Sequence, residues 1–230
     1  MSVLTEKIKK KIKDHALSDP KNEVCGLIMA NQSVILYKNI AADREPHFII
    51  SHLEINKAQK KDKLIAVYHS HIQNKEDKDD KLSNEDEVIA EYFNVRFVLY
   101  SVNDDKFFEY VPTGKRVDYL NRPYVFKILD EVTLIKDYYE WELNVKLENL
   151  KNRENLELFL KENGFVESGE LQKGDVILIH LNNDPLKPKL LLYTENDKVI
   201  IHKEYELSKV TEYNYGLKKW TKKIYRHQKL

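Results

Sequence analysis

Segments with a helical hydrophobic pattern alternate with strand-like segments through the first 112 residues of this chain. Apolar residues spaced three or four apart predict helices, and short apolar or alternating runs predict strands. Helices are therefore expected over 3–18, 52–63 and 83–93, and strands over 24–30, 33–38, 47–51, 64–71, 95–102 and 107–111. Helices and strands interleaved in this order predict an α/β or α+β fold.

A segment rich in turn-forming residues follows. Residues 112–123 read PTGKRVDYLNRP, with two prolines and a glycine between periodic segments, which favours a linker. Beyond it, 129–143 and 155–165 have helical patterns. The apolar runs at 174–181, 189–194 and 199–204 are typical of a small antiparallel sheet. We therefore expect two α+β domains, 1–112 and 124–230, joined by a linker over 113–123.

Charge and hydropathy argue against several classes of protein. The chain carries 38 basic and 38 acidic residues, so it lacks the basic excess of a nucleic-acid-binding protein. No stretch approaches the ~20 apolar residues that a membrane-spanning helix needs, and the first residues lack the apolar run of a secretory signal. Cys25 is the one cysteine, so no internal disulfide can form. We expect no nucleic acid partner, no membrane span and no signal peptide.

Two histidines in the predicted strand over 64–71 suggest a metal site. Side chains two apart on a strand share a face, so His69 and His71 project together. A catalytic zinc takes three protein ligands and keeps its fourth position for water. Asp86 can supply the third ligand if its predicted helix packs beside the strand. Glu23, at the head of an apolar strand, can act as the base toward that water.

Each of these residues also has an ordinary structural interpretation. Ser83 and Asp86 form the Ser-x-x-Asp pattern of a helix N-cap with an acid at its third position. The histidines can be half-exposed strand residues, and Glu23 a turn acid. Cys25 is best interpreted as a small buried apolar residue and not as a ligand. Asp86 can also serve as cap and metal ligand at once.

The order of the motifs carries a family resemblance. NEVCGLI, VYHSHI and LSNEDE resemble the JAMM (MPN-type) metallopeptidase pattern of Glu, His-Ser/Thr-His, seven residues and Ser-x-x-Asp. Eleven residues, not seven, separate His71 from Ser83 here. We interpret about four of them as a lengthened loop over 72–82, which is exposed, mobile and thermodynamically tolerable. Counting seven residues from His71 leads to Asp79, so Asp79 and Asp80 remain alternative ligands to Asp86.

The JAMM resemblance implies a mixed sheet with flanking helices over 1–112 and a role for each motif residue. His69, His71 and Asp86 would bind zinc. Glu23 would take a proton from water and pass it to the leaving amine. Ser83 would donate a hydrogen bond to the oxyanion as the carbonyl becomes tetrahedral. The implied reaction is hydrolysis of a peptide or isopeptide bond.

The second half resembles the NlpC family of papain-like cysteine peptidases, with a helix packed on an antiparallel sheet. LDEVTLIKDYY is similar to that family's nucleophile helix, LQKGDVILIH to a strand, and KLLLYTENDKVIIHK to the histidine strand and the next one. Glu131 stands in the place of the cysteine, Lys189 in that of the histidine, and His202 at or beside the third position. A carboxylate cannot replace a thiolate that forms and releases an acyl-enzyme. The resemblance therefore implies an inactive domain used for binding or assembly.

Glu131 and Lys189 have the same charge signs as the two catalytic groups of a papain-like site. An active site of this kind holds a thiolate at a helix N-terminus facing an imidazolium. Glu131 and Lys189 preserve an acid and a base at those positions, so we expect them to form a salt bridge. The alternative is two unrelated surface charges.

A JAMM domain followed by an NlpC-type domain resembles the layout of lambda-type phage tail tip assembly proteins. The resemblance implies other phage tail proteins as substrate or partners, and a location in the host cytoplasm during assembly or in the virion tail tip. Three functions follow: a zinc peptidase of tail assembly, a non-catalytic structural tail-tip factor, and a peptidoglycan hydrolase. The last is the weakest because its domain lacks the nucleophile.

Overall fold

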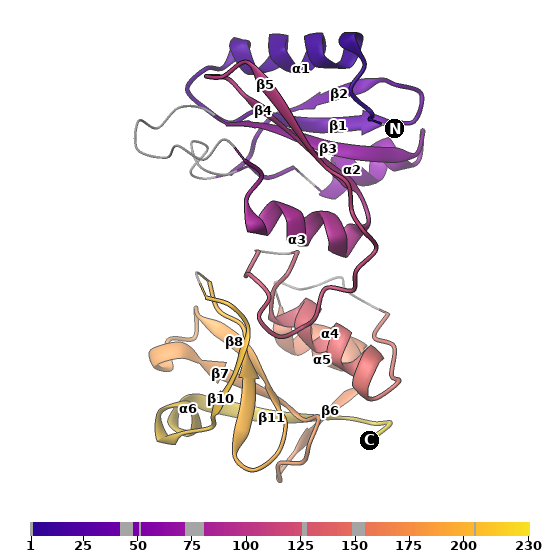
Figure 1. Cartoon of the computed structure of the whole chain (residues 1–230). Helices are drawn as coiled ribbons and strands as arrows, with labels where there is room; N and C mark the ends of the chain where they lie inside the picture. Colours follow the sequence, from indigo (N-terminus) through magenta and orange to yellow (C-terminus); the bar gives the residue numbers. More distant parts are fainter. Residues whose placement is uncertain are drawn as a thin grey trace. The chain divides into compact units, whose positions relative to one another are not determined.

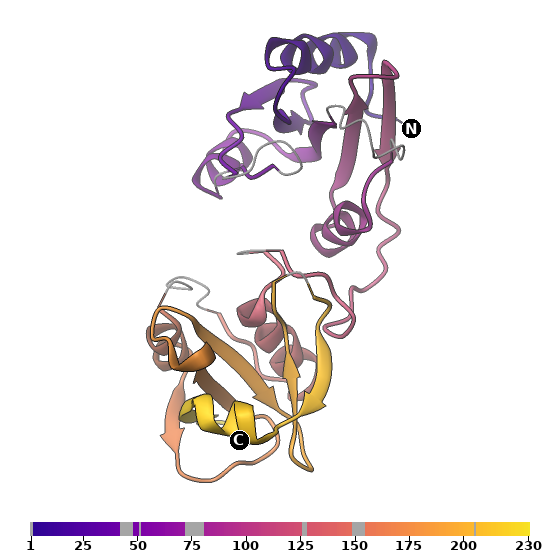
Figure 2. The same ribbon diagram turned by 90° about the vertical axis from the view of Figure 1, so that its left-hand side faces the viewer.

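The computed structural model describes the whole chain except residues 1, 42–47, 51, 72–80, 126–127, 149–154 and 205. The chain divides into two compact units, Met1–Val117 and Asp118–Leu230, drawn in Figures 1 and 2. Each unit combines helices with its own sheet, which confirms the expected α+β class. The division lies inside the segment expected as the linker. Among the described residues, no helix has both the length and the apolar character to cross a membrane.

The first unit is a five-stranded sheet in the order β2-β1-β3-β4-β5 with helices on both faces. All neighbouring strands are antiparallel except β3 and β4, which are parallel. Its elements are α1 (Glu6–Ser18), β1 (Cys25–Met29), β2 (Val34–Tyr37), α2 (His52–Gln59), β3 (Leu64–His71), α3 (Asn84–Phe93), β4 (Arg96–Ser101) and β5 (Lys106–Tyr110). The mixed sheet follows from the β3-α3-β4 connection, in which a helix carries the chain to a parallel neighbour.

Apolar residues on α1 and α2 cover opposite faces of this sheet. Ile8, Ile12 and Ala16 on α1 lie on one stripe of the helix and are buried against Tyr68 and other residues of the central strands. Ala58 on α2 packs with Leu27 and Met29, which alternate with residues that face α1. β1 is therefore buried on both faces, which explains its continuous apolar run.

The strand expected over 47–51 does not form. Residues 48–50 have no strand structure, and residues 47 and 51 lie outside the described part of the chain. The Ile49 amide donates to the side chain of Asn39, and the Ile40 amide donates to the Ile49 carbonyl. These polar groups are thus satisfied within a loop, so the apolar residues indicated burial but not a sheet ladder.

Glu91, which lies on α3, holds the last residues of the first unit against that helix. Its carboxylate accepts hydrogen bonds from the Tyr110 hydroxyl and from the backbone amides of Thr113, Gly114 and Lys115. The bond from the Thr113 amide and the others together lower the pKa of Glu91 to about 2. The first residues of the expected linker are therefore attached to the helix that carries Asp86.

The second unit is a six-stranded antiparallel sheet in the order β10-β9-β8-β7-β11-β6. Its elements are α4 (Glu131–Glu142), α5 (Leu156–Glu162), β6 (Phe165–Ser168), β7 (Val176–His180), the short 3-10 helix η1 (Leu181–Asn183), β8 (Pro188–Tyr193), β9 (Lys198–Ile201), β10 (Lys209–Glu212), α6 (Tyr215–Trp220) and β11 (Thr221–His227). α4 and α5 pack on one face of the sheet, and Leu217 of α6 packs on the other. The expected sheet holds β7, β8 and β9, whereas β6, β10, β11 and α6 were not expected from the sequence.

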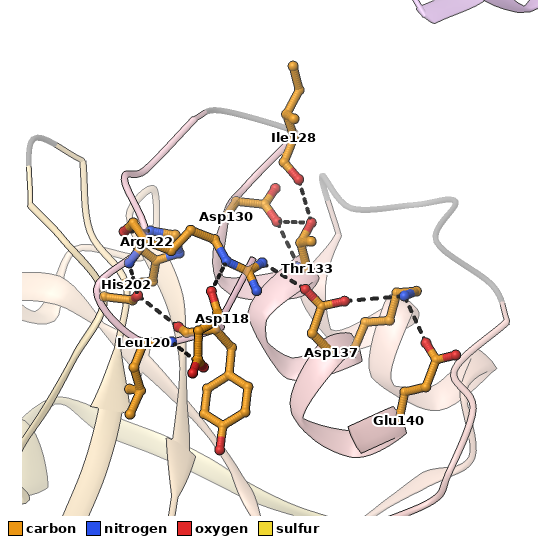
Figure 3. A network of polar contacts seen from close by, with 12 residues as sticks. Asp118, Leu120, Arg122, Ile128, Asp130, Thr133, Asp137, Glu140 and His202 are labelled. Atoms are coloured by element: carbon orange, nitrogen blue, oxygen red, sulfur yellow. Dashed lines mark hydrogen bonds and ion pairs between the residues drawn. The ribbon is translucent and has the colours of Figure 1, made fainter. Parts of the chain in front are cut away.

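A buried arginine ties the start of the second unit into its core, as Figure 3 shows. Arg122 is 1% exposed, and its Nη1 lies 2.7 Å from Oδ2 of Asp137 on α4. Its Nε donates to the Asp118 carbonyl, and its own carbonyl is 3.1 Å from Nε2 of His202. Residues 118–123, expected as part of a linker, are thus packed into the second unit.

Replacing glycine in β1 tests the sheet packing. A Cβ at Gly26 would lie 2.4 Å from the Tyr68 ring and closer still to the Ile35 carbonyl. We expect Gly26→Ala to lower the free energy of unfolding of the first unit by about 1–3 kcal/mol. Gly169→Ala is the control, because a Cβ there meets nothing within 4 Å. Urea unfolding of both variants measures the difference, and equal stabilities would contradict this packing.

Breaking the buried ion pair tests the packing of Arg122. Asp137→Ala leaves the guanidinium in the core without its carboxylate, so we expect a loss of about 3–5 kcal/mol. Replacing both residues, as Arg122→Met with Asp137→Leu, should cost clearly less because no charge stays buried. Denaturant unfolding of the second unit compares the two. A single variant as stable as the wild type would show that the pair is exposed in solution.

Candidate metal centre

The pairing of β1 with β3 places an acid beside a histidine. Cys25 is opposite His69 in this antiparallel pair. The register continues past the end of β1, where the Ser70 amide donates to the Val24 carbonyl and the Val24 amide donates to the Ser70 hydroxyl. Glu23 therefore comes next to His71, and its Oε1 lies 3.8 Å from Nε2 of that histidine.

The two histidines project from the same face of β3, as expected from their spacing. Their Nε2 atoms are 3.3 Å apart. Two nitrogen ligands of a tetrahedral zinc, each about 2.0–2.1 Å from the metal, stand about 3.3 Å from each other. Burial lowers the pKa of His69, so that this imidazole is neutral and offers a lone pair. The His71 side chain is 28% exposed and leaves the pair open to solvent on one side.

Asp86 is both a helix cap and a member of the cluster. Its Oδ2 accepts hydrogen bonds from the backbone amide and hydroxyl of Ser83, and the Asp86 amide donates to that hydroxyl. The same oxygen lies 3.6 Å from Nε2 of His69. The helix-cap interpretation of Ser-x-x-Asp is therefore confirmed. The same capping box holds the carboxylate close to His69, where it could also serve as a metal ligand.

Together the three side chains form a group that could hold a metal ion. One ligand atom each from His69, His71 and Asp86 lies within 4.8 Å of the others. Two imidazoles and one carboxylate are a ligand set of catalytic zinc sites, which leave one position for water or substrate. The expected ligands thus converge, whereas Asp79 and Asp80 and most of the loop over 72–82 lie outside the described residues.

Glu23 borders this group but is not one of its three members. It is 5% exposed, and burial, with the nearby charge of Asp86 as a second cause, raises the pKa of its carboxyl to about 8. A buried carboxyl beside a metal site is suited to accept and return a proton. Cys25 is buried too, and burial raises the pKa of its thiol to about 12, which agrees with an inert apolar residue.

The ring of His69 is oriented mainly by packing in the part of the chain that the structure describes. A metal-binding histidine normally donates its second ring N–H to a carboxylate, a carbonyl or water. Nδ1 of His69 is buried and has no hydrogen-bond partner among the described residues. Instead the ring of Phe48 stacks on the imidazole, with centroids 4.5 Å apart and planes 16° apart. Sequence reasoning missed Phe48, because the strand expected at 47–51 gave no reason to place it at the site.

The expected ion pair in the second unit is confirmed. Nζ of Lys189 lies 3.4 Å from Oε1 of Glu131, and the two side chains are 17% and 9% exposed. They are therefore not unrelated surface charges. His202 is buried, and its ring meets that of Tyr124 edge to face. The Tyr124 hydroxyl in turn accepts a hydrogen bond from Nζ of Lys189. Burial raises the pKa of Glu131, and the charge of Lys189 opposes that rise.

Comparison with known proteins does not assign the chain to a family. No protein-family model matches the sequence, and no curated protein matches it either. The candidate site therefore rests on the geometry of its own side chains.

Metal binding is the direct test of the cluster. We expect one divalent ion per chain, and we expect His71→Ala to weaken binding by well over tenfold, because second-sphere changes alone cost about 10–100-fold. His15→Ala is the control, since His15 lies in the same unit but bonds to the Tyr68 hydroxyl. Elemental analysis and chelator competition measure the content and affinity. The same metal content in His71→Ala as in wild type would rule out this site.

Proposed function

We propose that the first unit is a zinc-dependent peptidase or isopeptidase. The observation that carries this proposal is the convergence of His69, His71 and Asp86 beside the buried carboxyl of Glu23. A structural zinc site is closed by four protein ligands, whereas three ligands with a neighbouring acid are typical of a hydrolytic site. The order of the motifs along the chain, which resembles that of JAMM metallopeptidases, supports the same reaction class.

Each side chain has a distinct part in the proposed reaction. His69, His71 and Asp86 would hold the zinc ion, which would supply an acidified water and a Lewis acid for the scissile carbonyl. Glu23 takes the proton of the attacking water on its carboxylate and gives it to the nitrogen of the leaving amine as the C–N bond breaks. Burial keeps this carboxylate away from bulk water, which favours the return of the proton to the substrate.

Ser83 would stabilise the oxyanion. Its hydroxyl donates to Asp86 at 2.7 Å in the described structure. To serve the reaction, this hydroxyl must turn its proton toward the substrate oxygen, while its backbone amide continues to bond to Asp86. If the hydroxyl does not turn, the site binds metal without efficient turnover, which is the behaviour of a structural assembly factor.

The proposed setting is the assembly of a phage tail tip. A JAMM-like unit followed by an NlpC-like unit supports this setting, and other tail proteins are then the substrate or partners. The second unit would bind and not cleave, because Glu131 and Lys189 replace a nucleophile with an ion pair. A peptidoglycan hydrolase is disfavoured for the same reason.

Separating metal binding from turnover tests the proposal. We expect Glu23→Gln to keep one zinc per chain and to lose about 10²–10⁴-fold in hydrolysis, because an amide cannot carry the proton. Glu85→Gln is the control, since Glu85 is an exposed acid in the first turn of α3. Internally quenched peptides and lysine-linked isopeptides are the probes. Undiminished hydrolysis by Glu23→Gln would exclude the proposed base, and loss of zinc would make Glu23 a ligand or a support of one.

A further inference from the structure

Asn39 is a buried polar residue that the proposed reaction does not use. Its side chain is held just after β2, and the residue is 6% exposed. Nδ2 donates to the carbonyl of Glu23 at 2.9 Å. Oδ1 accepts from the amides of Ala41 at 3.0 Å and Ile49 at 3.1 Å. The side-chain amide of Asn39 therefore forms hydrogen bonds with the backbone of the proposed base, Glu23, and with the backbone of two further residues, Ala41 and Ile49.

The donor half of Asn39 fixes the main chain at Glu23. This residue precedes β1, so its carbonyl has no partner in the β1 ladder. A buried carbonyl without a hydrogen bond is costly, and Nδ2 of Asn39 satisfies it. The next residue, Val24, is bonded on its other side to Ser70 of β3. The backbone that carries the base is thus held from two directions.

The acceptor half of Asn39 closes the loop that carries Phe48. By binding the amides of Ala41 and Ile49, Oδ1 brings residues on both sides of Phe48 to one point. The Ile40 amide reinforces the closure through the Ile49 carbonyl. Phe48 lies flat on His69, whose Nδ1 finds no hydrogen-bond partner in the described part of the chain. Stacking therefore restrains the orientation of this imidazole, a task that outer-sphere contacts perform in metal sites.

We propose that Asn39 is the positioning residue of the metal centre, setting the backbone of Glu23 with its amide group and the ring of His69, through Phe48, with its oxygen. The part that concerns Glu23 rests on the proposed hydrolytic function. The part that concerns His69 rests only on the geometry of the metal cluster. An asparagine that only stabilised a turn would form just the local hydrogen bond to the Ala41 amide, two residues further along the chain. The bonds of Asn39 to Glu23 and Ile49 go beyond that role.

Asn31 provides a matched control. Its Oδ1 accepts from the amide of Ser33, two residues on, at 2.9 Å. It therefore makes the same local bond as Asn39, in the exposed turn between β1 and β2. In the described part of the chain its side chain bonds neither to Glu23 nor to Ile49. Asn31→Ala removes a turn bond of this type and leaves the candidate site untouched.

Two substitutions separate the two halves of the carboxamide. Asn39→Ala removes both. Asn39→Asp keeps an oxygen for the amides of Ala41 and Ile49 but places a second oxygen, not a donor, against the carbonyl of Glu23. The three variants are compared with wild type by thermal unfolding, by zinc affinity from chelator competition, by NMR shifts of the His69 ring protons in metal-free protein, and by kcat and KM on internally quenched peptides.

The expected results differ for each variant. In Asn39→Ala the His69 ring protons lose the upfield shift caused by stacking, and zinc affinity falls about 10–100-fold, the usual effect of removing outer-sphere support. In Asn39→Asp the ring shift and zinc affinity stay close to wild type, while kcat falls about tenfold or more at unchanged KM, as for an interaction made in the transition state. Asn31→Ala matches wild type in all of these measurements.

The outcomes that overturn the inference do not coincide with those that overturn the proposed function. Wild-type zinc affinity and His69 shifts in a folded Asn39→Ala would show that the ring is set by other contacts. If Asn39→Ala does not fold, Asn39→Asp decides, because wild-type kcat in that variant removes the role toward Glu23. A wild-type protein that binds zinc without cleaving any probe would end the peptidase proposal, while the NMR and affinity measurements would still decide the role toward His69.

Discussion

The register between β1 and β3 is the constraint on which the candidate site depends. Slipping one strand by a single residue would turn each of its side chains to the opposite face of the sheet. Such a slip would separate Glu23 from His71 and remove Tyr68 from the apolar face that α1 covers. Ser70 fixes the register at the end of the pair, through its amide and its hydroxyl, on the face away from the histidines. The serine between the two histidines therefore has a structural role of its own.

Local patterns predicted those parts of the site that depend on local geometry. The period of a strand placed His69 and His71 on one face, and a four-residue cap motif oriented Asp86. Asn39 and Phe48 could not be found in this way, because their roles depend on contacts between residues distant in the sequence. A lone asparagine after a strand is typical of any turn, and only the closed loop reveals its partners.

The same limit explains the errors in the fold. Residues 118–123 were expected to belong to a linker because two prolines and a glycine stand within 112–123. Arg122 is nevertheless buried, paired with a carboxylate fifteen residues further along the chain. β11 was missed because its lysines and arginine obscure a strand whose inward side chains include Tyr225. In the second unit the ion pair of Glu131 and Lys189 was expected, because the family resemblance placed an acid and a base at two positions that face each other.

The attachment of residues 113–115 to Glu91 gives the protein a mechanical property. The chain leaves the first unit through hydrogen bonds to α3, and α3 begins at the cap that holds Asp86. A force that pulls on residues 113–115 would therefore act on α3 before it acted on the sheet. A pull on the second unit would strain Asp86 while the two histidines stayed fixed in the middle of the sheet. A metal ion held by the cluster would then be bound least firmly when the chain is stretched.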